Sequence, residues 1–163
     1  MLVTAEEIRF EQDVANNIAD TQRLSPYIDK AEREWVINAI GVKNYKRLEQ
    51  NDYDEVLTLL MNGGYYNDDT IYFAGLRKAI IYLAYSLFVR NDNVFSTQSG
   101  FRYKGNADFS DRVDDKTIVR VAKENEARGI KALNECVSFL NSQEGGCSTR
   151  RRLGNTTLRV IGN

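Results

Sequence analysis

The chain contains no histidine, so it lacks the side chain that most often serves as a general base and as a zinc ligand. Its two cysteines, Cys136 and Cys147, are too few for a disulfide framework and fit no metal-binding spacing. No apolar run approaches the roughly 18 residues that span a membrane, and the first residues do not resemble a signal peptide. We therefore expect a protein with no catalytic site, metal, cofactor or membrane association, made in a reducing cytoplasm.

The chain also has almost no net charge, because its 22 basic and 23 acidic residues nearly cancel to −1. A general nucleic-acid binder would be more basic. The 163 residues, 42% of them hydrophobic and 28% charged, are typical of one globular domain with a core of its own.

The chain has a single proline, Pro26, and its apolar residues recur at helical spacing. Thr4 and Glu7 form a capping-box pattern at the start of the first helix. Ser25 is expected to cap a second helix that has Pro26 at its first position, and Gly41 is expected to end it. The pattern predicts a mainly α fold with helices near 5–20, 26–40, 42–48, 54–61, 68–91 and 114–141.

The last two predicted helices are the longest, and we expect them to pack antiparallel as the backbone of a helical bundle. Helix 68–91 is apolar on more than one face, which indicates the most buried helix. Asp68 and Asp69, like Asp114 and Asp115, would place negative charge at helix N-termini. A calcium site built from Asp114, Asp115 and the preceding acids Asp108 and Asp111 is disfavoured, because their spacing does not match a calcium loop.

Between these two helices, residues 92–112 alternate aromatic with polar side chains around glycine turns. About twenty residues is long for a connection in a compact bundle, and such loops are usually functional or disordered. The aromatic residues argue against disorder, so we expect a protruding β-hairpin or an arm that contacts a partner. Its candidate interface residues are Phe95, Phe101, Tyr103 and Phe109.

A polar, glycine-rich tail occupies residues 143–163, where four arginines and Glu144 give a net charge of +3. The arginines Arg150, Arg151, Arg152 and Arg159 fit either the phosphates of a nucleic acid or the carboxylates of a neighbouring subunit. Beyond them, residues 156–161 alternate like a short strand, which needs the edge of another sheet. The tail lacks the apolar area to order itself in water. We therefore interpret it as an extended strap that docks on another subunit through its arginines and through Leu158, Val160 and Ile161.

Two further residue types have alternative interpretations. Cys136 lies on the apolar face of the last helix and is expected to be a buried hydrophobic residue rather than a nucleophile. The tyrosines, among them Tyr65, Tyr66 and Tyr72, fit either core packing with the hydroxyl at the rim or subunit interfaces.

The order of these features resembles a known family. A short helix precedes the segment S-P-Y-I-x-x-A-E-R-E-W-V (25–36), and a central apolar helix, an aromatic-glycine loop (97–103), a long helix and a polar tail follow. This pattern, over residues 5–142, resembles the head–tail connector, or adaptor, proteins of tailed bacteriophages. It is most similar to those of phages and prophages of Bacteroides-type gut bacteria, including crAss-like phages.

The resemblance implies a helical connector domain (1–142) that forms a homo-oligomeric ring of about twelve copies beneath the portal. Its partners would be the portal protein and further tail or ring proteins, and genomic DNA would pass through its lumen. The protein would be made in the host cytoplasm and reside at the virion neck. Two alternatives remain: a small DNA-associated phage factor that uses its basic tail on phosphates, and an enzyme with carboxylate chemistry.

Overall fold

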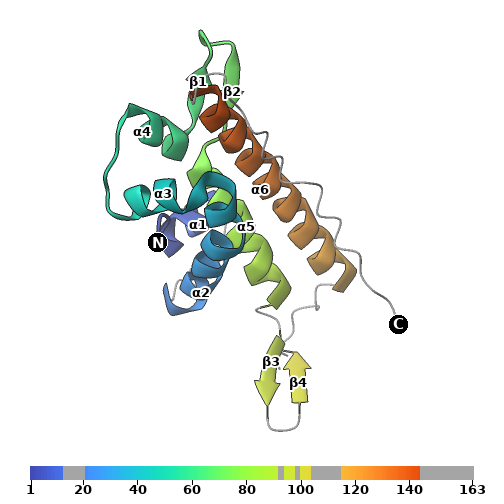
Figure 1. The fold of residues 1–163 in the computed structure, drawn as a ribbon. Helices are drawn as coiled ribbons and strands as arrows, with labels where there is room; N and C mark the ends of the chain where they lie inside the picture. Colours follow the sequence, from blue (N-terminus) through green and yellow to red (C-terminus); the bar gives the residue numbers. More distant parts are fainter. Residues whose placement is uncertain (13–20, 92–93, 98–99, 104–114, 144–163) are drawn as a thin grey trace.

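The computed structural model describes residues 1–12, 21–91, 94–97, 100–103 and 115–143. These residues form a mainly helical fold, as the sequence predicted (Figure 1). Its helices are α1 (Ala5–Gln12), α2 (Thr21–Ala31), α3 (Ile37–Glu49), α4 (Glu55–Asn62), α5 (Leu76–Asn91) and α6 (Asp115–Gln143), with a π-helical segment, η2 (Glu32–Val36), between α2 and α3. The strands form two hairpins, β1 (Gly64–Tyr66) with β2 (Ile71–Phe73), and β3 (Val94–Thr97) with β4 (Gly100–Tyr103).

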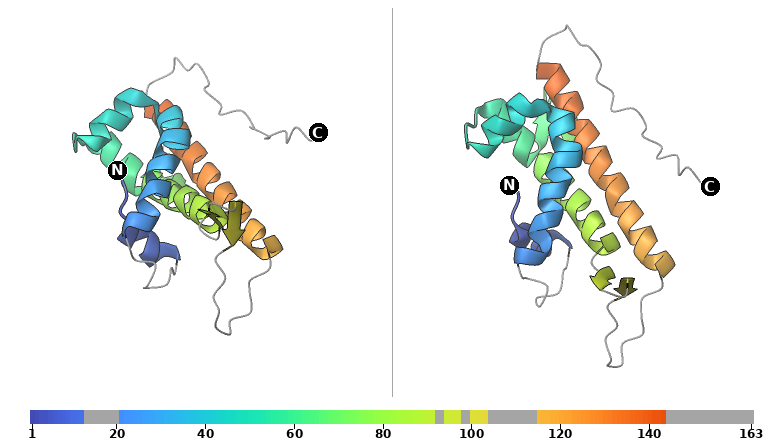
Figure 2. Two further views of the ribbon diagram at one scale, coloured as in Figure 1. Left: turned by 90° about the horizontal axis from the view of Figure 1, so that it is seen from below. Right: turned by 60° about the horizontal axis from the view of Figure 1, so that its bottom comes forward.

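Helices α5 and α6 make the most extensive contact between any two described elements, and they run antiparallel. This arrangement confirms the predicted backbone of the bundle (Figure 1). The other side of α5 is covered by α2, so that α5 lies in the middle (Figure 2). Gly129 of α6 lets the two helices approach closely, because a Cβ atom there would lie 2.6 Å from Cγ of Leu83. The side chains of α5 that are buried are Leu76, Ala79, Ile80, Ile81, Leu83, Ala84, Ser86, Leu87 and Phe88.

The capping box predicted for the first helix is present. The backbone N–H of Thr4 donates to Oε2 of Glu7 at 2.7 Å, and the N–H of Glu7 donates to Oγ1 of Thr4 at 3.3 Å. Helix α1 extends to Gln12, and the remainder of the predicted helix 5–20 lies outside the described residues.

The predicted start of the second helix at Ser25 and Pro26 is wrong. Helix α2 begins at Thr21, so Pro26 lies inside it. The reason is burial on one face: Leu24, Ile28 and Ala31 are spaced by helical turns, and each has 0% of its surface exposed. Burial of Leu24 favours a helical turn before the proline.

Glycines and an aspartate mark the helical segments that follow, close to the predicted ranges 26–40, 42–48 and 54–61. Gly41 has φ of 81° and interrupts the helical backbone within α3. Asp54 caps α4, because its Oδ1 accepts a hydrogen bond of 2.7 Å from the N–H of Leu57. Gly63, with φ of 75°, ends α4.

The predicted helix 68–91 is wrong in its first part, where the β1–β2 hairpin stands instead. Asn67, Asp68 and Asp69 have φ of 56°, 54° and 59°, a left-handed conformation that Asn and Asp tolerate and that a helix start does not contain. Asp68 and Asp69 are therefore turn residues and cap no helix. The hairpin closes at its base where Gly75, with φ of 87°, passes Gly63 so closely that a Cβ on Gly75 would lie 2.4 Å from the Gly63 nitrogen.

The sequence left a hairpin or an extended arm open between the two long helices, and the described part of this segment forms a hairpin. Strands β3 and β4 pair antiparallel, with Thr97 opposite Gly100 at the turn and Val94 opposite Tyr103 at the base. Because α5 begins after one hairpin and ends before the other, the two hairpins lie at opposite ends of the α5–α6 pair (Figure 1).

Candidate functional site

The β1–β2 hairpin has two different faces, because side chains alternate along each strand. Tyr66 and Phe73 share the face that packs on α6, where the Phe73 ring stacks on Phe139 at a centroid distance of 4.8 Å and Tyr66 meets the same ring at 5.3 Å. Tyr65 and Tyr72 stand opposite each other on the outer face, with centroids 5.2 Å apart. Each of these two tyrosines has 58% of its surface exposed.

The tyrosines thus divide between the two interpretations that the sequence left open. Tyr66 is partly buried against the core, whereas Tyr65 and Tyr72 form an exposed aromatic pair. Tyrosine is enriched in protein interfaces because it combines a large apolar ring with a hydroxyl that tolerates water. The outer face of the hairpin therefore has the composition of an interaction surface.

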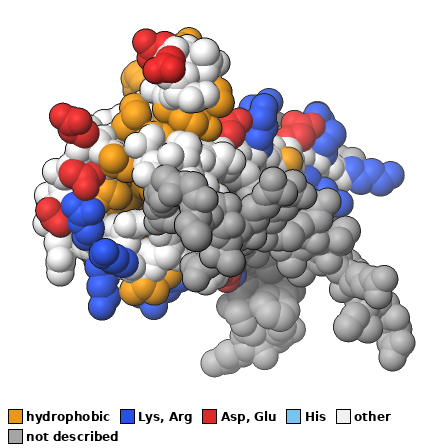
Figure 3. Space-filling model, turned by 45° about the horizontal axis from the view of Figure 1, so that its top comes forward, with side chains coloured by type: hydrophobic (Ala, Val, Ile, Leu, Met, Phe, Trp, Pro, Cys, Tyr) orange, Lys and Arg blue, Asp and Glu red, His pale blue; other side chains and the backbone are white. Residues whose placement is uncertain are grey.

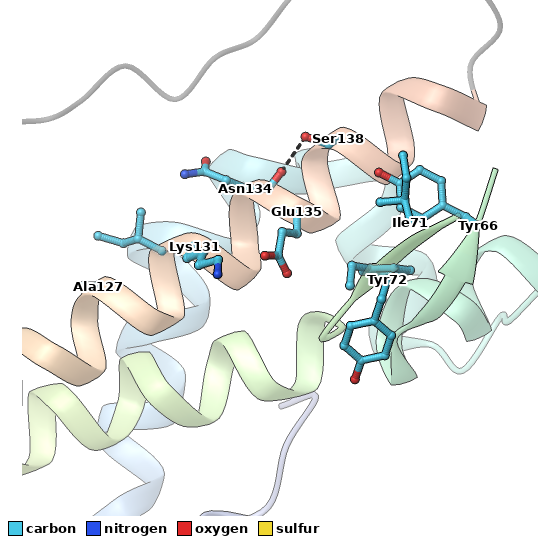
Figure 4. A pocket seen from close by; sticks show the side chains of 10 residues that line it. Tyr66, Ile71, Tyr72, Ala127, Lys131, Asn134, Glu135 and Ser138 are labelled. Atoms are coloured by element: carbon cyan, nitrogen blue, oxygen red, sulfur yellow. Dashed lines mark hydrogen bonds between the residues drawn. The ribbon is translucent and has the colours of Figure 1, made fainter. Parts of the chain in front are cut away.

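A groove of about 700 Å³ lies between this hairpin and α6. Its hairpin wall and its helix wall face each other in Figure 4, where Tyr66 and Ile71 lie at one end and Lys131 and Glu135 line the helix side. Most of its surface is apolar, and Ile71 and Ile130 remain 42% and 38% exposed. The residues that line it are Tyr66, Ile71, Tyr72, Phe73, Ala127, Ile130, Lys131, Asn134, Glu135 and Ser138.

Negative charge stands at the tip of the hairpin, next to the groove. Asp68 and Asp69 are exposed and follow directly on Tyr66 and Asn67. Within the described part of the chain neither carboxylate forms an ion pair, and residues 63–75 contain no lysine or arginine. The acidic tip is visible above apolar side chains in Figure 3. The site thus combines an apolar groove, two exposed aromatic rings and two exposed carboxylates.

Cys136 follows the groove residue Glu135 on α6 and is fully buried, as the sequence predicted. Burial, together with the neighbouring negative charge of Glu135, raises the pKa of its thiol to about 12. A thiol with this pKa stays protonated at neutral pH and is a poor nucleophile. Cys136 therefore serves the core.

A second polar cluster surrounds Glu32 in η2, which has only 1% of its surface exposed. Its Oε1 accepts a 2.6 Å hydrogen bond from the N–H of Leu2, and its Oε2 accepts a 2.7 Å bond from the hydroxyl of Tyr45. Burial and this hydrogen bond raise the pKa of Tyr45 above its ordinary value. Because each carboxylate oxygen has a donor, the cluster joins the first residues of the chain to α3 and offers no reactive group.

Among the residues that the structure describes, no three His, Cys, Asp or Glu side chains gather in a way that could hold a metal ion. No described helix is both long enough and apolar enough to cross a membrane.

The predicted interface residues are only partly placed by the structure. Phe95 on β3 pairs with Arg102, and Phe101 and Tyr103 on β4 pair with Ser96 and Val94. These three aromatic residues are thus brought together on one hairpin, at the end of the molecule opposite the groove. The other candidates, Phe109, Arg150, Arg151, Arg152, Leu158, Arg159, Val160 and Ile161, lie outside the described residues.

Sequence reasoning missed the β1–β2 hairpin and with it the groove. The signal was present, because Gly63, Gly64 and Gly75 bracket the segment Y-Y-N-D-D-T-I-Y-F, in which aromatic residues flank an Asn-Asp turn. Asp68 and Asp69 before an apolar stretch also fit the start of a helix, and the prediction followed that alternative.

The geometry of this site can be set beside known proteins. A search of curated proteins and a search of solved structures each returned no match to the chain. One family model matches residues 36–145, a stretch that runs from the end of η2 past α6 and includes both hairpins and the groove. Because the match covers more than half of the chain, the protein belongs to this family, which is described as a family of unknown function, DUF6712.

Proposed function

We propose that this chain is a structural subunit of the head–tail connector of a tailed bacteriophage, where copies form a ring between the portal and the tail. The proposal is supported by the placement of two hairpins at opposite ends of an antiparallel helix pair. A subunit that joins two layers of an assembly needs contact elements at both ends, and a ring subunit needs a rigid body between them. The closely packed α5–α6 pair is suited to be that body.

The observation that carries the proposal is the exposed aromatic pair Tyr65 and Tyr72 beside an apolar groove. Exposed apolar surface of this kind is unfavourable in water unless a partner covers it. In a ring, each copy would present the same surface to the next, and the lumen would let DNA pass.

The proposal is tested in a phage whose genome encodes this chain. We expect mass spectrometry to detect the protein in purified particles. Electron cryomicroscopy should show density at the neck that fits a ring of subunits with this fold. Deletion of residues 143–163 should block assembly of tailed particles while circular dichroism shows a folded bundle. Normal tailed particles without the protein would overturn the proposal.

One observation favours a second candidate, a DNA-associated factor. Lys116, Lys123, Arg128 and Lys131 are exposed along α6. Such a face, together with Arg150, Arg151 and Arg152, could contact phosphates.

The two candidates differ in their response to salt. A DNA-associated factor should bind duplex with an affinity that falls by about 0.9 log units per phosphate contact for each log unit of salt. Replacing Arg150, Arg151 and Arg152 with alanine should flatten that slope. A subunit of the connector should show no binding that depends steeply on salt.

A further inference from the structure

We infer that the groove between the β1–β2 hairpin and α6 is the docking site for the C-terminal segment, residues 144–163, of a second copy of this chain. The inference rests on the proposed ring and names the contact that would join its neighbouring subunits. Three properties lead to it: the apolar surface of the groove, the charge of the hairpin tip, and the reach of the C-terminal segment.

The groove offers both an apolar floor and a strand edge. Ile71 and Ile130 are exposed in it, and the sheet of β1 and β2 has only two strands, so each strand has an outer edge without a described partner. An added strand satisfies such an edge with backbone hydrogen bonds, while its alternate side chains fill the adjacent pocket. Leu158 and Val160 alternate in this way within the β-branched stretch 156–161.

Charge at the hairpin tip is opposite to that of the segment, and on the helix wall of the groove the charges of Lys131 and Glu135 balance each other. The hairpin carries Asp68 and Asp69 and no basic residue between positions 63 and 75, whereas residues 144–163 carry four arginines and one glutamate. Arginine pairs with carboxylates in planar, often bidentate contacts. The hairpin tip therefore favours the run Arg150–Arg152 over a neutral or acidic peptide.

The segment is long enough to reach the groove of a second copy. The groove-lining residues of α6, Ser138 to Ala127, lie about 8 to 24 Å from Gln143 along the helix, at about 1.5 Å per residue. Leu158 comes fifteen residues after Gln143, which corresponds to about 50 Å of extended chain. Fully extended, the segment would therefore carry Leu158 well beyond its own groove and within reach of a neighbour's, and the proposed ring supplies that neighbour.

Disulfide trapping between two differently labelled full-length proteins tests this contact. One protein carries Ala127→Cys and the other carries Thr157→Cys, and both carry Cys147→Ser, so that the buried Cys136 is the only other thiol in each. Ala127 is exposed in the groove, so its replacement should leave the fold intact. After mixing and mild oxidation we expect a disulfide-linked heterodimer on a non-reducing gel.

A matched control replaces the exposed Lys43 of α3 with cysteine, and this protein should give no heterodimer with the Thr157→Cys protein. Replacing Asp68 and Asp69 with asparagine, or raising the salt to 1 M, where the screening length falls to about 3 Å, should lower the yield several-fold. Circular dichroism confirms that each variant is folded.

Two results would overturn the inference: no heterodimer above the level of the Lys43→Cys control, or a disulfide that forms only within one protein carrying both Ala127→Cys and Thr157→Cys. The result is separable from the proposed function. If the protein forms a connector ring but gives no heterodimer, the proposed function stands and this contact is wrong. If the heterodimer forms but the protein is absent from virions, the contact stands and the proposed function is wrong.

Discussion

At the scale of single residues, Gly129 controls how closely the two central helices approach. A Cβ at this position would lie 2.6 Å from Cγ and 3.1 Å from the backbone nitrogen of Leu83. Because the latter atom belongs to the backbone of α5, rotation of a side chain cannot relieve the overlap.

We therefore expect Gly129→Ala to lower the free energy of unfolding by about 1–3 kcal/mol, the usual cost of overpacking. This would occur although alanine favours a helix by about 1 kcal/mol over glycine. Urea denaturation measures the change, and Lys123→Ala on the exposed side of α6 should stay within about 0.5 kcal/mol of the unmodified protein. Equal or greater stability of Gly129→Ala would contradict the close approach.

Glu7 is a second residue with a specific role, because it joins the cap of α1 to Arg77 of α5. Burial opposes its ionisation, but hydrogen bonds from the backbone and the hydroxyl of Thr4, and the charge of Arg77, outweigh burial and hold the pKa of Glu7 below its ordinary value. The ionised carboxylate therefore stabilises the folded state.

The sign of this effect gives a pH dependence. The contribution of Glu7 is complete above its unfolded pKa, about 4.3, and is lost as the pH falls through the lower pKa of the folded state. We expect Glu7→Gln to be less stable than the unmodified protein at pH 7, with a difference that shrinks below about pH 4. Urea denaturation across this range measures the difference, and a difference that stays constant as the pH falls would contradict this role of Glu7.

At the scale of elements, caps and turns define where the helices begin and end. Asp54 and Asp52 both contact Arg47, at 3.0 Å and 2.8 Å, but only Asp54 also accepts the N–H of Leu57. Substitutions of these two aspartates can therefore distinguish the contribution of the helix cap from that of the exposed ion pair.

Asp54→Ala should destabilise the protein by about 0.5–2 kcal/mol through loss of the cap of α4. Asp52→Ala removes only the exposed ion pair with Arg47 and should cost less than about 1 kcal/mol. Thermal unfolding of both variants checks the order, and equal effects would show that the cap contributes nothing beyond the ion pair.

At the scale of the whole molecule, the two hairpins differ in how they join the core. The β1–β2 hairpin packs Tyr66 and Phe73 on Phe139, whereas β3 and β4 make few contacts with any helix. The first hairpin is therefore part of the core, and the second is an appendage.

Replacing residues 94–103 with a Gly/Ser linker of equal length should change the free energy of unfolding by less than about 1 kcal/mol, because few contacts are lost. Phe73→Ala should cost about 3–5 kcal/mol, since Phe73 is fully buried. Chemical denaturation compares the two. If the proposed function holds, the linker variant should fold yet fail to assemble tailed particles. A large loss of stability in this variant would instead show that the β3–β4 hairpin belongs to the core.

The sequence by itself determined the mainly α fold, the antiparallel pair of long helices and the helix ends at Gly41, Asp54 and Gly63. Each of these depends on local physics: apolar spacing, a capping side chain or a glycine with positive φ. The burial of Cys136 could also be predicted, because its position on the apolar face of α6 follows from helical period alone.

Only the tertiary structure decided the start of α2, the β1–β2 hairpin and the groove. Leu24 draws the turn before Pro26 into a helix because other elements bury it, and Asp68 and Asp69 become turn residues because Phe73 stacks on Phe139, 66 positions further along the chain. Contacts between residues so far apart are not encoded in a local window of sequence. The groove could not be predicted for the same reason, since its walls come from the β1–β2 hairpin and from α6 and exist only once the chain has folded.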